Sequence, residues 1–94
     1  MRLRAKVDTN HAEIVKALRE AGASVRSLAQ VGHGTPDLLV GWRGRNFLFE
    51  VKDPNRKPSE RQLTIDEKAW HYTWNGQVCV IESVEAAFEV MESC

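Results

Sequence analysis

Three ionisable residues lie at the ends of two apolar stretches, where charged side chains are unfavourable. Glu50 and Lys52 close the run 47–52, and Asp37 opens the run 37–42. Side chains alternate across a strand, so Glu50 and Lys52 share one face. Charges at the end of a core strand cost free energy unless they are paired or bind a metal. These residue types therefore indicate a reactive site.

The short turn 43–45 separates the two apolar runs and predicts an antiparallel hairpin. Pairing around this turn sets Asp37 beside Glu50. Directly opposed residues lie about 4.5–5.5 Å apart, and like charges there repel. A hard cation between the two carboxylates removes that repulsion.

Two carboxylates with several water positions suit Mg²⁺. A metal held in this way polarises a phosphoryl oxygen and activates a bound water. Lys52 can orient that water or stabilise the negative charge of the transition state. Glu13, at the edge of the first helix's apolar stripe, is a possible third carboxylate that reaches the metal through water. A capping box with Asn10 is the alternative explanation for Glu13.

Taken together, these residues resemble a known nuclease pattern. Gly34-Thr35-Pro36-Asp37 followed by Glu50-Val51-Lys52 is the PD-(D/E)XK motif. The fuller arrangement resembles the VRR-NUC branch, the virus-type replication-repair nucleases found in phage proteins and in larger DNA repair enzymes. Glu13 on a leading helix, the run 34–39 and Gln62 opening the next helix complete the resemblance, which spans about residues 10–87.

The resemblance implies Mg²⁺- or Mn²⁺-dependent hydrolysis of phosphodiester bonds, often in branched or flapped DNA, by a homodimer. It implies a catalytic set and a metal-binding set of residues. The catalytic set is Asp37, Glu50, Lys52 and Gln62, and the metal set is Glu13, Asp37, Glu50 and Val51. A capping box that begins at Ser59 explains Gln62 equally well.

Charge is distributed unevenly along the chain. The formal net charge is zero, but residues 1–61 hold twelve Lys/Arg and seven Asp/Glu, whereas residues 62–94 hold one and six. This asymmetry predicts a basic side, although zero net charge argues against tight unaided DNA binding. Individually the basic residues near the motif are ordinary surface charges, and as a group they are candidates for phosphate contacts. This group is Arg43, Arg45, Arg56, Lys57 and Arg61.

The elements that position these residues fit one domain over residues 1–94. The predicted order is α-β-β-β-α-β-α, with helices over 10–21 and 59–74 and a last helix after Ser83. Strands are predicted over 24–31, 37–42, 46–51 and 78–82. The fold class is therefore α/β, a small mixed sheet flanked by helices with a PD-(D/E)XK restriction-endonuclease-like core. The hairpin is expected to be covered on both faces, and Trp70 and Trp74 to face the core or a dimer interface.

The chain has no apolar run near the ~20 residues of a membrane helix and no signal-peptide pattern at its start. A cytoplasmic protein, in a phage-infected or bacterial cytosol, is expected. The leading functional hypothesis is a structure-selective DNA endonuclease that uses metal-activated water. A Holliday-junction resolvase or a restriction-type enzyme would share this centre. The rival from another class is a nucleic-acid-binding module that has lost catalysis.

Overall fold

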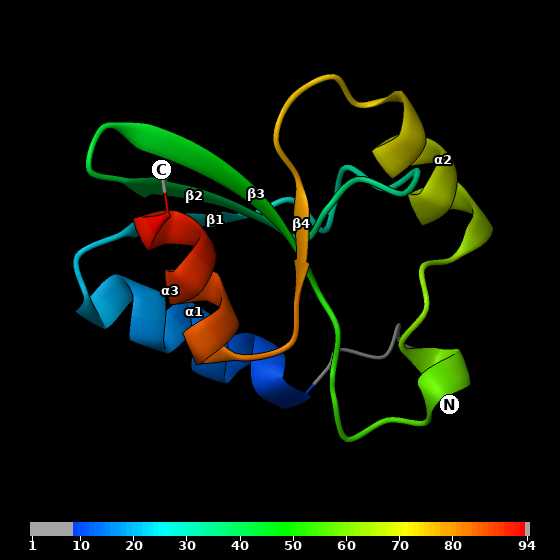
Figure 1. Ribbon diagram of the computed structural model, residues 1–94, viewed down its shortest axis with the longest axis horizontal. Coiled ribbons are helices and arrows are strands. Elements are labelled where there is room, and N and C mark those ends of the chain that lie inside the picture. Colours follow the sequence, from blue (N-terminus) through cyan, green and yellow to red (C-terminus); the bar gives the residue numbers. More distant parts are fainter. Residues whose placement is uncertain (1–8, 94) are drawn as a thin grey trace.

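The computed structural model describes residues 9–93 (Figure 1). Along the chain its elements are α1 (Thr9–Glu20), β1 (Ser24–Ser27), β2 (Leu38–Trp42), β3 (Arg45–Val51), the 3-10 helix η1 (Pro58–Glu60), α2 (Ile65–Thr73), β4 (Cys79–Ile81) and α3 (Val84–Glu92). The order of helices and strands confirms the predicted α/β arrangement.

The four strands form one mixed sheet in the order β1-β2-β3-β4. β1, β2 and β3 are antiparallel neighbours, and β4 runs parallel to β3. In the central hairpin, Leu38 pairs with Phe49 and Trp42 with Arg45, which is the predicted register. Arg43 and Gly44 form the turn with φ of 52° and 78°, as a two-residue hairpin with two left-handed positions requires.

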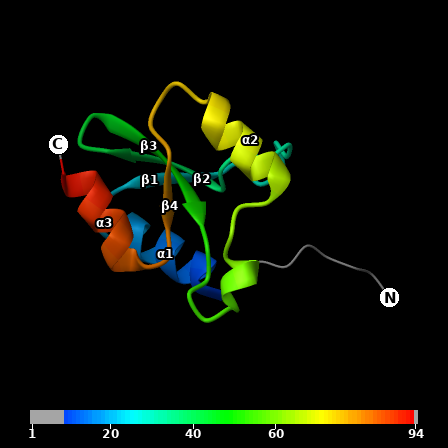
Figure 2. The same ribbon diagram turned by 45° about the vertical axis from the view of Figure 1, so that its right-hand side comes forward.

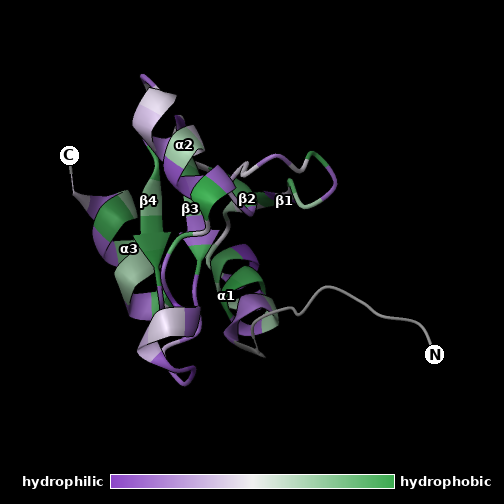
Figure 3. Cartoon of the chain, turned by 90° about the vertical axis from the view of Figure 1, so that its right-hand side faces the viewer, coloured by the Kyte–Doolittle hydropathy of each residue, from purple (hydrophilic) through white to green (hydrophobic). Residues whose placement is uncertain are grey.

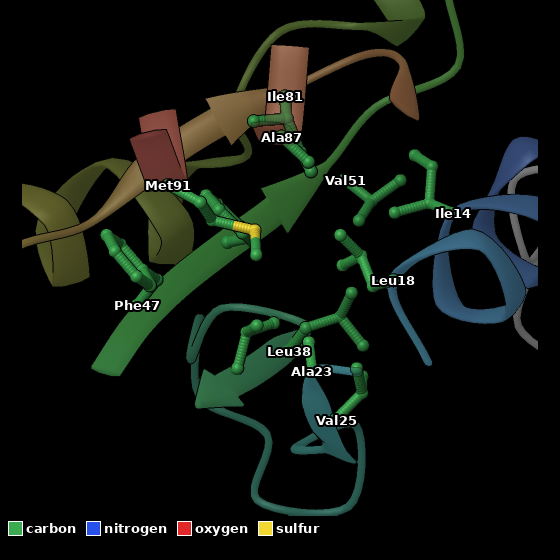
Figure 4. Packing of buried hydrophobic residues seen from close by; sticks show 12 residues of the cluster. Ile14, Leu18, Ala23, Val25, Leu38, Phe47, Val51, Ile81, Ala87 and Met91 are labelled. Carbon is green, nitrogen blue, oxygen red and sulfur yellow. The ribbon is translucent and has the colours of Figure 1, made fainter. Parts of the chain in front are cut away.

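The hydrophobic core lies on one face of the sheet, under α1 and α3 (Figure 4). Ile14 and Leu18 from α1 meet Ala87 and Met91 from α3 across the strands' inward side chains. Those inward side chains are Val25, Leu38, Val40, Phe47, Phe49, Val51 and Ile81. Ser83 begins α3 as expected, since its hydroxyl accepts a hydrogen bond from the Ala86 N–H.

Among residues 9–93, the opposite face of the sheet, called the open face below, is only partly covered, which corrects the prediction that both faces are covered. α2 lies on this side, apart from α1 and α3, and every one of its residues is at least partly exposed (Figures 2 and 3). Leu39 remains 37% exposed and Val80 44% exposed. Trp70 and Trp74 therefore do not join the core. Their rings stack on each other with centroids 4.5 Å apart.

Two predicted boundaries were wrong. The second helix begins at Ile65, because Thr64 and Glu67 form its capping box, whereas Ser59 lies in the single turn η1. The first strand ends at Ser27, whose hydroxyl accepts a hydrogen bond from the Ala29 N–H and turns the chain.

Asn10 lies inside α1 and is not its cap. The Asn10 side-chain amide donates hydrogen bonds to the carbonyls of Lys52 and Glu82, each at 3.0 Å. It therefore ties the start of α1 to the ends of β3 and β4. Within residues 9–93, the helices are too short or too polar to cross a membrane.

Candidate active site

Asp37 immediately precedes β2, and its carboxylate is bonded to the neighbouring strand. Asp37 Oδ2 accepts a hydrogen bond from the Val51 N–H at 2.7 Å. Continuing the β2–β3 register places Val51 opposite Pro36. The Asp37 carboxylate thus takes over where the backbone ladder ends, which fixes the orientation of this side chain.

In the same pairing, the main-chain carbonyl of Val51 has no backbone N–H opposite it. The N–H and C=O of a strand residue point to the same neighbour, so this carbonyl faces the Asp37 side. Pro36 has no N–H and cannot donate to it. The Val51 side chain is apolar and buried in the core, so only this carbonyl oxygen can serve as the predicted metal ligand.

Glu50 is 2% exposed although it is a carboxylic acid. In the continued register it faces Asp37 in a pair without mutual backbone hydrogen bonds, the arrangement in which opposed side chains are closest. Its Oε1 atom is buried and has no hydrogen-bond partner among residues 9–93. Burial, and then the charges of Asp37 and Glu67, raise the pKa of Glu50 to about 9.

Lys52 completes the cluster from the end of β3. Its ammonium nitrogen lies 3.6 Å from Glu50 Oε2 and 2.9 Å from Glu67 Oε1. Burial alone would lower the pKa of Lys52, but the hydrogen bond and charge of Glu67, with Glu50, raise it above its usual value. The lysine is therefore held in the charged form beside Glu50.

Glu67 was missed by the sequence interpretation. Its carboxylate accepts hydrogen bonds from the Lys52 ammonium and from the Thr64 N–H, both at 2.9 Å. Although burial acts to raise the pKa of Glu67, the bonds from Thr64 and Lys52 lower it. The available signal was Thr64 followed three residues later by Glu67, a second capping-box pattern.

Two predicted residues are not brought into this cluster. Gln62 does not open a helix: it is exposed between η1 and α2, and within the described chain it makes no hydrogen bond to Asp37, Glu50 or Lys52. Glu13 is exposed on α1 and is not among the charges that shift the pKa of Glu50. The residue of the following helix that contacts Lys52 is Glu67, whereas Gln62 was expected to do so.

The five basic candidates fall at two ends of the sheet. Arg43 and Arg45 belong to the β2–β3 turn, about five residues or ~17 Å along β3 from Glu50. Arg43 stacks on Trp42, and Arg45 stacks on Phe47 and donates to the Ser93 carbonyl.

The remaining three basic residues, Arg56, Lys57 and Arg61, follow β3 directly and share the site's end of the sheet. Arg61 Nη1 lies 3.7 Å from Glu82 Oε2, and the Arg61 side chain is 29% exposed.

The donor set suits a hard divalent cation that retains water. Within residues 9–93, no three His, Cys, Asp or Glu side chains converge as a ready metal cluster. The groups that could bind such a cation are the carboxylates of Asp37 and Glu50 and the main-chain carbonyl of Val51. Glu50 contributes its Oε1 atom, which has no hydrogen-bond partner within the described chain. Few protein oxygens plus water is the pattern that Mg²⁺ accepts.

A hollow on the core side of the sheet lies away from this centre. It has a volume of about 650 Å³ and lies between α1 and β1, where Val15, Val25 and Leu38 line it. These residues belong to the core face of the sheet, whereas Glu50 and Lys52 lie on the open face, so this hollow is not part of the reaction centre.

Comparison with known proteins decides the family. A solved structure described as "VRR_NUC domain" is 33% identical to this chain and superposes with a TM-score of 0.59. The match covers 89% of this chain and 96% of that one. The chain belongs to the VRR-NUC family. No family profile matches it, and no curated protein sequence does.

Membership in the VRR-NUC family accounts for the arrangement of the mixed sheet and its helices. The expected resemblance is thereby confirmed over nearly the whole described chain. Within this VRR-NUC domain, the acidic side chains of Asp37, Glu50 and Glu67 and the ammonium of Lys52 form the polar cluster at the end of the central hairpin.

Proposed function

We propose that this protein is a divalent-metal-dependent, structure-selective DNA endonuclease whose reaction centre is Asp37, Glu50 and Lys52. Family membership supports a nuclease-type, hydrolytic function in general. The observation that carries the proposal is the burial of Glu50 beside Asp37 with one carboxylate oxygen unpaired. A buried carboxylate oxygen without a partner is unfavourable, and a bound cation would supply the missing partner beyond what Lys52 offers to Oε2.

The metal would be held by the carboxylates of Asp37 and Glu50 and by the Val51 carbonyl. Glu13 is a candidate for an outer contact through water, given its place one turn after Asn10 on α1. Mg²⁺ or Mn²⁺ bound there supplies Lewis acidity toward a phosphoryl oxygen and toward water. Ligands must be deprotonated to bind a metal, so the raised pKa of Glu50 makes metal binding dependent on pH.

Lys52 acts on the reacting phosphate. Its ammonium group lies on the same side as Glu50 and is placed to stabilise negative charge on a phosphoryl oxygen. Glu67 acts through Lys52 and is a positioning residue, because its carboxylate holds the ammonium at 2.9 Å. Gln62 has no comparable support from its position.

DNA backbone contacts near the cut are assigned to Arg56, Lys57 and Arg61. Contacts of this kind position the duplex without reading its sequence. Arg43 and Arg45 remain predicted contacts, and only a duplex arm that extends along the sheet would reach them.

The proposed domain extent, oligomeric state and substrate follow from the same reaction centre. A single nuclease domain of residues 1–94 acting in the cytoplasm offers a short footprint, and a homodimer would place two such centres on a branched substrate. A four-way junction is therefore a candidate substrate. The second functional candidate is a nucleic-acid-binding module without catalysis, for which the predicted outcome is binding with unbroken strands.

A cleavage panel tests the proposal. Duplex, flap, fork and four-way junction substrates are incubated with Mg²⁺, Mn²⁺, Ca²⁺ or EDTA, and products are resolved on denaturing gels. Cleavage in Mg²⁺ or Mn²⁺ that is absent in EDTA and in Glu50→Gln is the expected result. Intact strands under every metal condition, with retained DNA binding, would establish the non-catalytic module instead.

A further inference from the structure

The open face of the sheet continues beyond the reaction centre in a regular way. Leu39 pairs with Leu48 and Gly41 with Asn46, in line with Asp37 and Glu50. Residues two apart on a strand point to the same face and lie about 6.6–6.8 Å apart. The Leu39–Leu48 pair is therefore the immediate neighbour of the acidic pair on the same surface.

A hollow of about 350 Å³ covers this neighbouring pair. Its lining includes Leu39, Asn46, Leu48, Trp74, Gly76 and Gln77, and it is called the trough below. Ligand sites commonly have volumes of about 300–1,000 Å³, with an apolar lining and a few polar groups. The trough has an apolar floor from Leu39 and Leu48 and a polar edge at Asn46.

Trp74 forms the aromatic wall of the trough. The pyrrole edge of its indole lies beside Gly76, where an added Cβ would lie 2.9 Å from Trp74 Nε1. Trp70 stacks on one face of the indole, with ring centroids 4.5 Å apart. Two neighbours thus hold the ring in place, and Trp74 remains 44% exposed.

The polar groups under the trough are already satisfied. The Gln77 side-chain amide accepts from the Leu48 N–H at 2.7 Å and donates to the Leu48 carbonyl at 3.3 Å. The floor therefore offers apolar surface and an aromatic face without strong hydrogen-bonding demand. A flat, stackable group suits such a surface better than a charged one.

We propose that the trough binds the base of an unpaired nucleotide adjacent to the phosphate at the reaction centre, stacked on Trp74. This inference rests on the proposed nuclease function and adds a substrate subsite to it. Aromatic side chains bind bases through stacking without reading their sequence. A base in an intact duplex is already stacked, so the trough selects strands that are unpaired near the cut.

A second copy of the chain is the competing occupant, and the position of the trough disfavours it. An occupant there lies one residue pair from Asp37 and Glu50. A permanent protein partner at that distance would obstruct the DNA strand that has to reach the centre. A nucleotide of that same strand causes no such conflict.

An abasic scan of the substrate tests the inference without altering the protein. The cleaved strand of a flap substrate carries one abasic site at each position around the mapped cut. We expect one position at which kcat/KM falls by roughly tenfold, within the range for loss of a stacked base. Equal rates at every position would overturn the proposal.

Variants then assign the effect to Trp74. In Trp74→Ala the intact substrate should be cleaved as slowly as the critical abasic substrate is by wild type, with no further loss on combining the two. Trp74→Phe should restore part of the rate. Tyr72→Ala is the matched control, because Tyr72 is a nearby aromatic residue in the last turn of α2 and is 90% exposed. An abasic penalty unchanged in Trp74→Ala would contradict the subsite.

A binding measurement separates this inference from the proposed function. A flap oligonucleotide with 2-aminopurine at the unpaired position is titrated in EDTA, where fluorescence reports stacking without cleavage. Quenching that needs Trp74 supports the trough even if no strand is cut. Cleavage that does not depend on any base would support the proposed nuclease function and contradict base binding in the trough. Sedimentation that shows Trp74→Ala converting a dimer to monomers, with equal loss at all abasic positions, would make the trough an interface between copies.

Discussion

The ammonium of Lys52 is held by Glu67, at 2.9 Å, more closely than by Glu50 at 3.6 Å. Glu67 also caps α2 by accepting a hydrogen bond from the Thr64 N–H. One carboxylate therefore both starts a helix and positions the lysine of the reaction centre. This shared group links the start of α2 to the end of β3.

Replacing Glu67 separates these two duties. Glu67→Ala keeps the Thr64 cap but should lower stability by about 0.5–1.5 kcal/mol through the lost hydrogen bond from the Thr64 N–H. It should also lower the pKa of Lys52, because the hydrogen bond and charge of Glu67, which oppose the effect of burial most strongly, are lost. As pH is raised, the activity of Glu67→Ala should therefore begin to fall at a lower pH than the activity of wild type. Glu67→Gln retains an acceptor oxygen and should recover most of the stability but not the alkaline limb. Asp66→Ala, in the same helical turn, is the control with a wild-type profile.

Lys52→Met keeps most of the side-chain length and deletes its charge. If Lys52 stabilises the transition state, kcat should fall by a factor on the order of 10² or more while DNA affinity changes little. Single-turnover rates and equilibrium binding in Ca²⁺ measure the two quantities. A parallel loss in affinity and rate would instead identify Lys52 as a phosphate anchor.

Stability of the metal-free protein should depend on Glu50. Its pKa is raised from 4.5 to about 9 on folding, so the native state binds the proton more tightly than the unfolded state. This contribution is complete below pH ~4.5 and is lost as pH rises toward ~9. Glu50→Gln should therefore gain stability relative to wild type as pH increases. Melting temperatures in EDTA from pH 5 to about 9 test the sign, and parallel curves would contradict it.

Added Mg²⁺ should reverse that trend, because the cation replaces the proton on Glu50. At about 100 times its dissociation constant, a ligand specific for the native state stabilises by about 2.7 kcal/mol. The rise in melting temperature with Mg²⁺ should therefore grow between pH 6 and about 8. An unchanged melting curve at saturating Mg²⁺ would argue against a carboxylate metal site.

Asp37 offers two informative substitutions. Asp37→Asn can still accept the Val51 N–H, and it removes a charge that raises the pKa of Glu50. Its metal-free fold should be as stable as wild type near pH 7.5, with cleavage and Mg²⁺ stabilisation lost. Asp37→Ala leaves the Val51 N–H unpaired and should cost about 1–3 kcal/mol. An asparagine variant that melts lower in EDTA and still cuts DNA would refute the assignment.

The central hairpin and its acidic pair were predictable because one local feature determines them. The 43–45 turn fixes which residues oppose each other, and the register places Asp37 and Glu50 together. The alternation of the strand then places Lys52 beside Glu50. These relations need only short-range geometry.

The start of the second helix was not predictable in the same way. Ser59 with Gln62 and Thr64 with Glu67 both fit a capping box. Tertiary contacts favour the second, because it places Glu67 on Lys52 and packs Gly34 against the Asp66 carbonyl. A Cβ at Gly34 would lie 2.3 Å from that oxygen, so glycine permits the close approach. The exposure of Trp70 and Trp74 follows from where α2 lies, which periodicity alone does not determine.

The Gln77 amide has a consequence for how the sheet edge beside Leu48 is protected from pairing with strands of other molecules. β4 begins only at Cys79, so within the described part of the chain the first half of β3 has no strand on that side and would present free backbone groups. Such edges recruit strands from other chains and promote aggregation. By pairing with both the N–H and the carbonyl of Leu48, Gln77 acts as a one-residue substitute for the missing strand. A glutamine side chain thereby closes an edge that a longer β4 would otherwise have to protect.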